Sequence, residues 1–243
     1  MTWSVVARDP ATGDLGLAVT TKFFAVGGLC AYGAGTLGAV ATQAFVNPLW
    51  GTDALKLLAE GCAAETVIAF LLPTDPNAAQ RQFHLVDRAG RTAAHTGAAC
   101  VEWAGHVAGP GVSVAGNMLA GPTVVDATLS AFLARSDLSF ADRLLAALDA
   151  GQAEGGDKRG KQSAALKIWG TEPHPKLDLR VDDHPEPLAE LRRLLEVAHE
   201  RYVAFMEALP TRARPGGDPD RSRIDARAAE LLAGRRGTAR PMP

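Results

Sequence analysis

The first 45 residues consist of short apolar and β-branched runs that are separated by turn residues. Partial alternation of apolar and polar positions within such runs is typical of β-strands. Turn-forming residues, among them Asp9, Pro10 and Gly13, lie between the runs. The pattern predicts four strands, at residues 2–8, 15–26, 28–32 and 36–45. Strands joined by such short turns indicate an antiparallel sheet that begins at the N-terminus.

The rest of the chain combines helical spacing of apolar residues with capping and helix-ending residues. Helices are expected at residues 52–60, 64–72, 122–134, 139–149 and 187–209. Further strands are expected at residues 82–87 and 91–96, which form a hairpin, and at 163–169 and 177–181. The glycine-rich segment 105–116 is expected to be irregular. This order is not a βαβ repeat, and it favours an α+β fold with one or two mostly antiparallel sheets covered by helices.

The composition changes after residue 209. The segment 211–243 contains eight arginines, four acidic residues and almost no large apolar residues. We therefore predict a folded domain at 1–209 and a disordered, basic, flexible tail at 210–243 with one short helix at 223–232. A basic tail is compatible with contacts to nucleic acid or anionic lipid, but a solvated extension is the favoured interpretation.

The overall charge and the cysteines indicate a soluble protein with no charged macromolecular partner. The formal net charge is −2, and hydrophobic residues make up 47% of the chain, as is ordinary for globular proteins. We therefore expect neither a nucleic-acid nor a membrane partner. Cys30, Cys62 and Cys100 lack CxxC spacing, so we interpret them as reduced thiols. Since no secretion signal is recognisable, we expect a cytoplasmic protein.

Two glycine motifs resemble nucleotide-binding sequences but lack the necessary context. Residues 33–38 match GxGxxG, yet the next segment is strand-like and leaves no room for the required helix. Residues 155–161 resemble a P-loop, but Gln162 stands where that loop needs Ser or Thr. The histidines do not show zinc-binding spacing, and no G-x-S-x-G motif occurs. We therefore expect no cofactor and no metal.

Thr2 offers nucleophilic chemistry. A small second residue favours removal of Met1, which would leave an α-amine beside the threonine hydroxyl. Such an amine titrates at about pH 8 and can accept the hydroxyl proton, so one residue supplies nucleophile and base. The first hairpin is expected to bring Thr20, Thr21 and Lys22 near Thr2, and a lysine there would lower the hydroxyl pKa. Small residues are also common at position 2 without catalysis, and Lys22 could be an ordinary edge-strand lysine.

Several stretches of the chain resemble the bacterial and archaeal family called domain of unknown function 1028. They are residues 2–10, 22–27, 40–44, 96–97, 103–105, 116–121, 155–166 and 179–185. The resemblance extends from Thr2 to about residue 195 and leaves the tail outside. Because this family is classed with the N-terminal nucleophile hydrolases, the resemblance implies a four-layer αββα sandwich with the nucleophile at the start of the first strand. It implies no particular substrate.

The resemblance and the residue chemistry together suggest a set of site residues. We expect Thr2 to be the nucleophile, Lys22 to tune it, and Asn117 to donate a hydrogen bond to the oxyanion. Asn117 could instead be a turn asparagine. Arg159 could bind a substrate carboxylate and Asp157 an amino group, or the two could pair with each other. The substrate-binding candidates are Gln43, His95, Asp157, Arg159, Gln162 and Ser163.

The expected function is that of an amidohydrolase. It would cleave a C–N bond in a small amide or short peptide through an acyl-enzyme on Thr2. The expected partners are this small-molecule substrate and further copies of the chain, since a homo-oligomer is plausible for such an architecture. The alternative is a catalytically silent protein of the same fold that binds a small molecule or serves in assembly.

Overall fold

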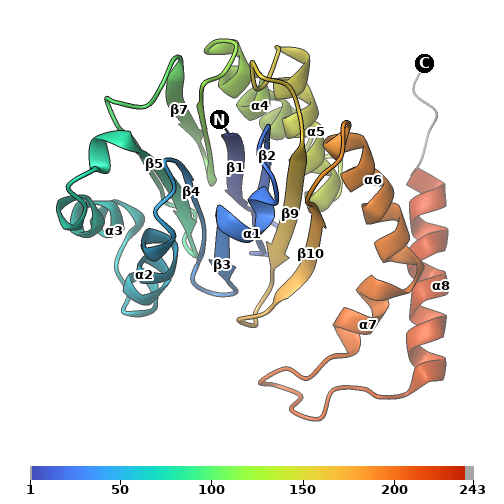
Figure 1. The fold of residues 1–243 in the computed structure, drawn as a ribbon. Helices are drawn as coiled ribbons and strands as arrows, with labels where there is room; N and C mark the ends of the chain where they lie inside the picture. Colours follow the sequence, from blue (N-terminus) through green and yellow to red (C-terminus); the bar gives the residue numbers. More distant parts are fainter. Residues whose placement is uncertain (1, 239–243) are drawn as a thin grey trace. The chain divides into compact units, whose positions relative to one another are not determined.

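The computed structural model describes residues 2–238, and these form two compact units (Figure 1). The first unit ends at Leu191 and the second begins at Arg192. The boundary expected from composition, at residue 209, lies inside the second unit. No helix within residues 2–238 combines the length and the apolar character that crossing a membrane requires.

The first unit contains a six-stranded antiparallel sheet, here called sheet A. Its strand order is β10-β9-β2-β1-β8-β7. The strands are β1 (Thr2–Arg8), β2 (Leu15–Thr21), β7 (Ala104–Gly109), β8 (Val112–Asn117), β9 (Ser163–Trp169) and β10 (Pro175–Val181). β1 pairs with β2 on one side and with β8 on the other. This central position agrees with the burial of β1, because nearly every one of its residues is buried.

A second antiparallel sheet, sheet B, has the order β3-β4-β5-β6. Its strands are β3 (Ala31–Ala34), β4 (Gly38–Ala44), β5 (Arg81–Asp87) and β6 (Thr92–Thr96). The predicted hairpin around residues 88–90 is confirmed. Asp87 Oδ1 accepts the N–H groups of Ala89 and Arg91 at 2.9 and 3.0 Å, and Gly90 supplies a φ of 82°. These contacts close the turn.

Two of the predictions about strands are wrong. The segment 105–116 is not irregular, since it forms most of the β7–β8 hairpin. The strand predicted at 15–26 ends at Thr21, and α1 (Val26–Leu29) takes the place of the start of the strand predicted at 28–32. The chain turns there because Ala25 has a left-handed φ of 54° and the Val26 N–H bonds Ser163 Oγ at 3.1 Å.

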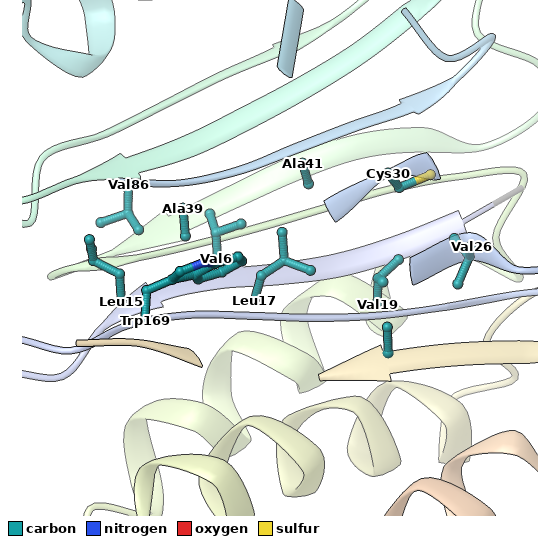
Figure 2. Close-up of a cluster of buried hydrophobic side chains, with 11 residues drawn as sticks. Val6, Leu15, Leu17, Val19, Val26, Cys30, Ala39, Ala41, Val86 and Trp169 are labelled. Carbon is teal, nitrogen blue, oxygen red and sulfur yellow. The ribbon is translucent and has the colours of Figure 1, made fainter. Parts of the chain in front are cut away.

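The two sheets pack face to face, with an apolar cluster between them (Figure 2). Leu17 and Val19 of β2 are packed in this cluster with Ala39 and Ala41 of β4. Cys30 lies in the same cluster, and its burial raises the pKa of its thiol to about 12. The Cys30 side chain is therefore a neutral thiol that packs as part of the hydrophobic core.

Helices cover the outer face of each sheet (Figure 1). α4 (Thr123–Ala134) and α5 (Phe140–Ala153) contact sheet A, whereas α2 (Pro48–Ala59) and α3 (Ala64–Leu71) contact sheet B. Trp50 of α2 packs edge-on against Phe83 of β5, with ring centroids 5.6 Å apart. Ser139 caps α5 as predicted, since its hydroxyl accepts the Asp142 N–H at 3.2 Å. The prediction of an α+β fold with antiparallel sheets covered by helices is confirmed.

The second unit is helical. It contains the end of α6 (Pro187–Val197), a π-helical turn at Ala198–Tyr202, α7 (Val203–Ala208) and α8 (Arg221–Thr238). Ala204 of α7 packs with Ile224 and Ala228 of α8, and Arg227 Nε lies 2.7 Å from Glu207 Oε2. The helix predicted at 223–232 is longer in the structure, since α8 extends from Arg221 to Thr238. It occupies much of the segment that we expected to be a flexible tail.

Candidate functional site

Thr2 lies where three strand ends of sheet A meet. β1 begins there, whereas β2 and β8 end there, with Trp3 opposite Thr20 and Thr2 opposite Asn117. Side chains alternate along a strand, and Ser4 hydrogen-bonds with residues of sheet B. The side chain of Thr2 therefore projects from the same face of β1, toward the space between the sheets.

Hydrogen bonds hold both the hydroxyl and the carbonyl of Thr2. Its Oγ1 donates to Thr21 Oγ1 at 3.2 Å. Its carbonyl oxygen accepts from Asn117 Nδ2 at 3.3 Å and from Gln43 Nε2 at 3.5 Å. Only 6% of the residue is exposed. Thr2 is thus fixed at the end of the central strand and does not extend freely into solvent.

A buried polar network runs between the sheets from Gln43 to His84. Ser4 Oγ lies 2.7 Å from both Gln43 Oε1 and His84 Nε2, and His84 Nδ1 lies 3.0 Å from Ser113 Oγ. The Ser4 hydroxyl has one proton and donates it to Gln43, so its oxygen must accept the proton of His84 Nε2. This assigns the Nε2–H tautomer to His84. Burial lowers the pKa of the imidazole to about 3, so the ring is neutral at physiological pH.

The amide of Gln82 connects this network to the neighbours of Thr2. Its Oε1 accepts from Gln43 Nε2 at 2.8 Å and from Asn117 Nδ2 at 2.9 Å. Its Nε2 donates to the Gly116 carbonyl at 2.8 Å. Asn117 is the last residue of β8, so it is a strand residue and not the turn asparagine of the alternative. The side chains of Gln43 and Asn117 therefore lie beside Thr2, as predicted, but they hold its backbone.

The network contains four residues that the sequence interpretation did not include, namely Ser4, Gln82, His84 and Ser113. A signal for two of them exists in the sequence. Gln82 and His84 alternate with apolar residues along β5, which predicts one polar face on a strand that is wholly buried. A buried strand with a polar face indicates that a hydrogen-bonded partner lies opposite it.

The loop after α5 reaches the same end of sheet A, where Asp157 forms a β-bridge with Leu119. The Asp157 carboxylate is buried, and it accepts the Lys22 N–H at 2.8 Å and the Arg159 N–H at 2.9 Å. Arg159 Nη2 also lies 3.3 Å from Asp157 Oδ2. The structure therefore shows the pairing alternative for Asp157 and Arg159. This brace fixes the backbone of Lys22, the residue that follows Thr21.

Lys22 lies at the expected end of the hairpin, but its ammonium group is directed elsewhere. The side chain is exposed, and Nζ donates to the Lys161 carbonyl at 3.2 Å. The group that meets the Thr2 hydroxyl is the hydroxyl of Thr21. A hydroxyl can orient Thr2 by a hydrogen bond, but it carries no charge that would shift the pKa as a lysine would.

Gln162 and Ser163 support the loop that follows β2. The Gln162 N–H donates to the Thr21 carbonyl at 2.9 Å. The Ser163 hydroxyl donates to the Phe23 carbonyl at 2.5 Å, and the side chain is fully buried. Both residues lie close to the predicted site, and the contacts in the structure give them a supporting role.

His95 lies on the other side of sheet B, which corrects its prediction as a substrate-binding residue. It pairs with Phe83 in the β5–β6 ladder, and its ring lies 6.3 Å from that of Trp50 on the helix-covered face. The next residue, Thr96, faces inward and accepts from Gln82 Nε2 at 2.9 Å. A shift of one residue along a strand reverses the face, so the position after His95 is the one directed toward the network.

In the part of the chain that the structure describes, no three His, Cys, Asp or Glu side chains are grouped so as to hold a metal ion.

The fold and the site define an α+β protein with two packed antiparallel sheets and a threonine at the start of the central strand. The family model described as "Family of unknown function (DUF1028)" matches residues 2–191, so the chain belongs to this family, as the resemblance predicted. The crystal structure of protein SPO2555 from Silicibacter pomeroyi, described with the same family, is similar to this chain. It has 32% sequence identity and a TM-score of 0.83, and the match covers 90% of this chain and 99% of that chain. No curated relative matches the chain.

Proposed function

We propose that the protein is an N-terminal nucleophile hydrolase with the four-layer αββα arrangement of that group, and that Thr2 attacks the carbonyl carbon of an amide. The observation that supports this proposal best is the position of Thr2, which is buried at the start of the central strand with its hydroxyl 3.2 Å from that of Thr21. The proposal requires removal of Met1, because the α-amine of Thr2 is the base.

The proposed reaction has two stages, which are acylation of Thr2 with release of the amine and hydrolysis of the resulting ester. The α-amine takes the hydroxyl proton while the Thr2 oxygen bonds to the amide carbon, and an oxyanion forms. The oxyanion collapses, the C–N bond breaks, and the protonated α-amine gives its proton to the leaving amine. Water, activated by the same α-amine, then hydrolyses the ester, which releases a carboxylic acid and restores Thr2. The net reaction converts an amide and water into an acid and an amine.

Asn117 and Gln43 have positioning roles in this proposal. Asn117 Nδ2 donates to the Thr2 carbonyl at 3.3 Å and so fixes the strand end that carries the nucleophile. Gln43 Nε2 lies 3.5 Å from the same carbonyl, and its shorter hydrogen bonds to Gln82 Oε1 and the Ala115 carbonyl hold the neighbouring strands. Asn117 Nδ2 has two protons, and both have acceptors, namely the Thr2 carbonyl and Gln82 Oε1. An oxyanion role for Asn117 therefore requires the oxyanion to replace one of these acceptors in the transition state.

A screen of small amides tests the proposal. Wild type and the variants Thr2→Ser and Thr2→Ala are compared for release of amine, with Thr52→Ala as a matched control because Thr52 is an exposed threonine on α2. Thr2→Ser keeps a hydroxyl and is expected to retain turnover, whereas Thr2→Ala is expected to fold and to lose it by at least about 10³-fold. Thr52→Ala should match wild type.

Two results would count against the proposed chemistry. Equal turnover in wild type and Thr2→Ala would show that another group performs the reaction. Absence of turnover in every protein, together with no acyl-enzyme on Thr2, would favour the silent binding or assembly protein of the same fold.

A further inference from the structure

Exposed large apolar side chains gather at the end of the first unit where Thr2 lies. Ten such side chains are exposed among the described residues, and five of them are in loops or a helix start adjoining strand ends on that side. These are Phe23, Phe24, Phe45, Leu49 and Val101. Exposed apolar side chains concentrated on one part of a surface are typical of binding sites.

Phe45 is held in place although the residue is 62% exposed. It follows Ala44, whose left-handed φ of 65° turns the chain out of β4. The Arg81 guanidinium lies 4.4 Å from the Phe45 ring centroid and also hydrogen-bonds the Phe45 carbonyl. Arg81 is itself buried and paired with Asp75, with Nε 2.9 Å from Oδ2. A buried ion pair therefore fixes an aromatic ring that gains little burial within the fold.

The backbone that carries Phe23 and Phe24 is fixed in a similar way on the side of sheet A. The Lys22 N–H is held by Asp157 at 2.8 Å, and the Phe23 carbonyl by Ser163. Phe23 and Phe24 are nevertheless 53% and 61% exposed. Strand β1, which begins with Thr2, pairs with β2 and contacts β4. Phe23 and Phe24 follow the end of β2, and Phe45 follows the end of β4. Apolar rings on a backbone that is already fixed lower the entropic cost of binding an apolar ligand.

We propose that the amide cleaved at Thr2 carries a large apolar acyl group, aromatic or aliphatic, which packs against Phe24 and Phe45. This inference rests on the proposed function for the identity of the reacting bond. The apolar preference itself is a property of binding. It can therefore be measured on a protein that cannot react.

The test uses Thr2→Ala, in which the chemistry is removed, and three p-nitroanilides that share one leaving group. The acetyl compound is compared with the hexanoyl and phenylacetyl compounds by equilibrium binding. We expect the two larger acyl groups to bind at least about tenfold more tightly, since each buries a substantial apolar surface. Adding Phe24→Ser or Phe45→Ser should reduce this ratio at least about fivefold. The matched control is Phe70→Ser, because Phe70 is an equally exposed phenylalanine on α3.

The possible outcomes separate this inference from the proposed function. Equal binding of all three compounds, or an equal loss of preference in the Phe70→Ser control, would overturn the apolar preference even if Thr2 were acylated in wild type. A tenfold preference in Thr2→Ala without turnover in wild type would support the surface and overturn the chemistry. If Phe24→Ser and Phe45→Ser instead converted a dimer into monomers without affecting binding, the surface would be an interface between copies of the chain, and the inference would fail.

Discussion

Replacement of His84 by glutamine is expected to change how the stability of the first unit depends on pH. The imidazole is wholly buried between the sheets, where it donates to Ser4 and accepts from Ser113. Burial lowers its pKa from 6.5 to about 3. In the unfolded chain the same ring would titrate near its ordinary value. Between these two pKa values the unfolded state binds one more proton than the native state does.

The sign and size of the effect follow from this difference. The neutral ring is compatible with the fold above pH 6.5, so its full contribution to stability is present there. As the pH falls from 6.5 toward 3, the unfolded state gains a proton that the native state excludes, and the free energy of unfolding drops by about 1.4 kcal/mol per pH unit. At pH 5 the loss attributable to His84 is thus about 2 kcal/mol. His84→Gln removes this dependence.

Urea unfolding between pH 7.5 and 4.5 measures the effect. All four tryptophans, Trp3, Trp50, Trp103 and Trp169, lie in the first unit, so their fluorescence reports on that unit. Wild type is expected to lose about 2 kcal/mol more than His84→Gln between pH 7.5 and pH 5. Titrating groups that do not interact with His84 contribute equally to both proteins and cancel in the difference, and His106 is the titrating neighbour whose charge also lowers the pKa of His84.

Ser113→Ala is the control, because it removes a hydrogen bond to His84 and leaves the buried ring in place. It should be less stable than wild type by about 1 kcal/mol at pH 7.5 yet keep the wild-type dependence on pH. The reasoning would be refuted if wild type and His84→Gln lost stability in parallel, since His84 would then not be held neutral by the fold.

Two further predictions concern packing, and urea unfolding measures both. Leu148→Ala should lower the free energy of unfolding by about 2–5 kcal/mol, because this α5 side chain is fully buried, whereas Leu133→Ala, at 42% exposure, should cost less than about 1 kcal/mol; similar losses would contradict the assigned burial. Gly97→Ala would place a Cβ 2.3 Å from the Ala79 carbonyl oxygen and should cost about 1–3 kcal/mol, whereas Gly121→Ala meets nothing within 4 Å and should be nearly neutral. A neutral Gly97→Ala would show that this close approach can relax.

Elements defined by short-range signals could be predicted from the sequence. The Ser139 cap lies next to the helix that it starts, and the turn at 88–90 lies between the strands that it joins. The end of β2 could not be predicted in this way. The residues that follow Thr21 are held by partners far along the chain, since Asp157 accepts the Lys22 N–H and the Ser163 hydroxyl donates to the Phe23 carbonyl.

The candidate site was predictable as a location but not as a set of contacts. The sequence indicated that Thr2, Asn117 and the loop containing Asp157 meet at one end of the fold, and the structure places them there. Whether an inward position holds His95 or Thr96 depends on strand register, which the sequence does not determine. The glycine-rich segment 105–116 was mistaken for irregular structure, although it forms most of the β7–β8 hairpin and one of its glycines, Gly116, is required by close packing. A Cβ there would lie 2.8 Å from the Cβ of Trp3.

The central claim is that a free α-amine and its own hydroxyl act together on Thr2. The most direct test is the mass of the intact protein before and after incubation with a β-lactone, whose ring opens on an activated hydroxyl to leave an ester. We predict a chain that lacks Met1 and gains one equivalent of the lactone, with the ester on Thr2 and no gain in Thr2→Ala. Retention of Met1, or equal labelling of wild type and Thr2→Ala, would contradict the account.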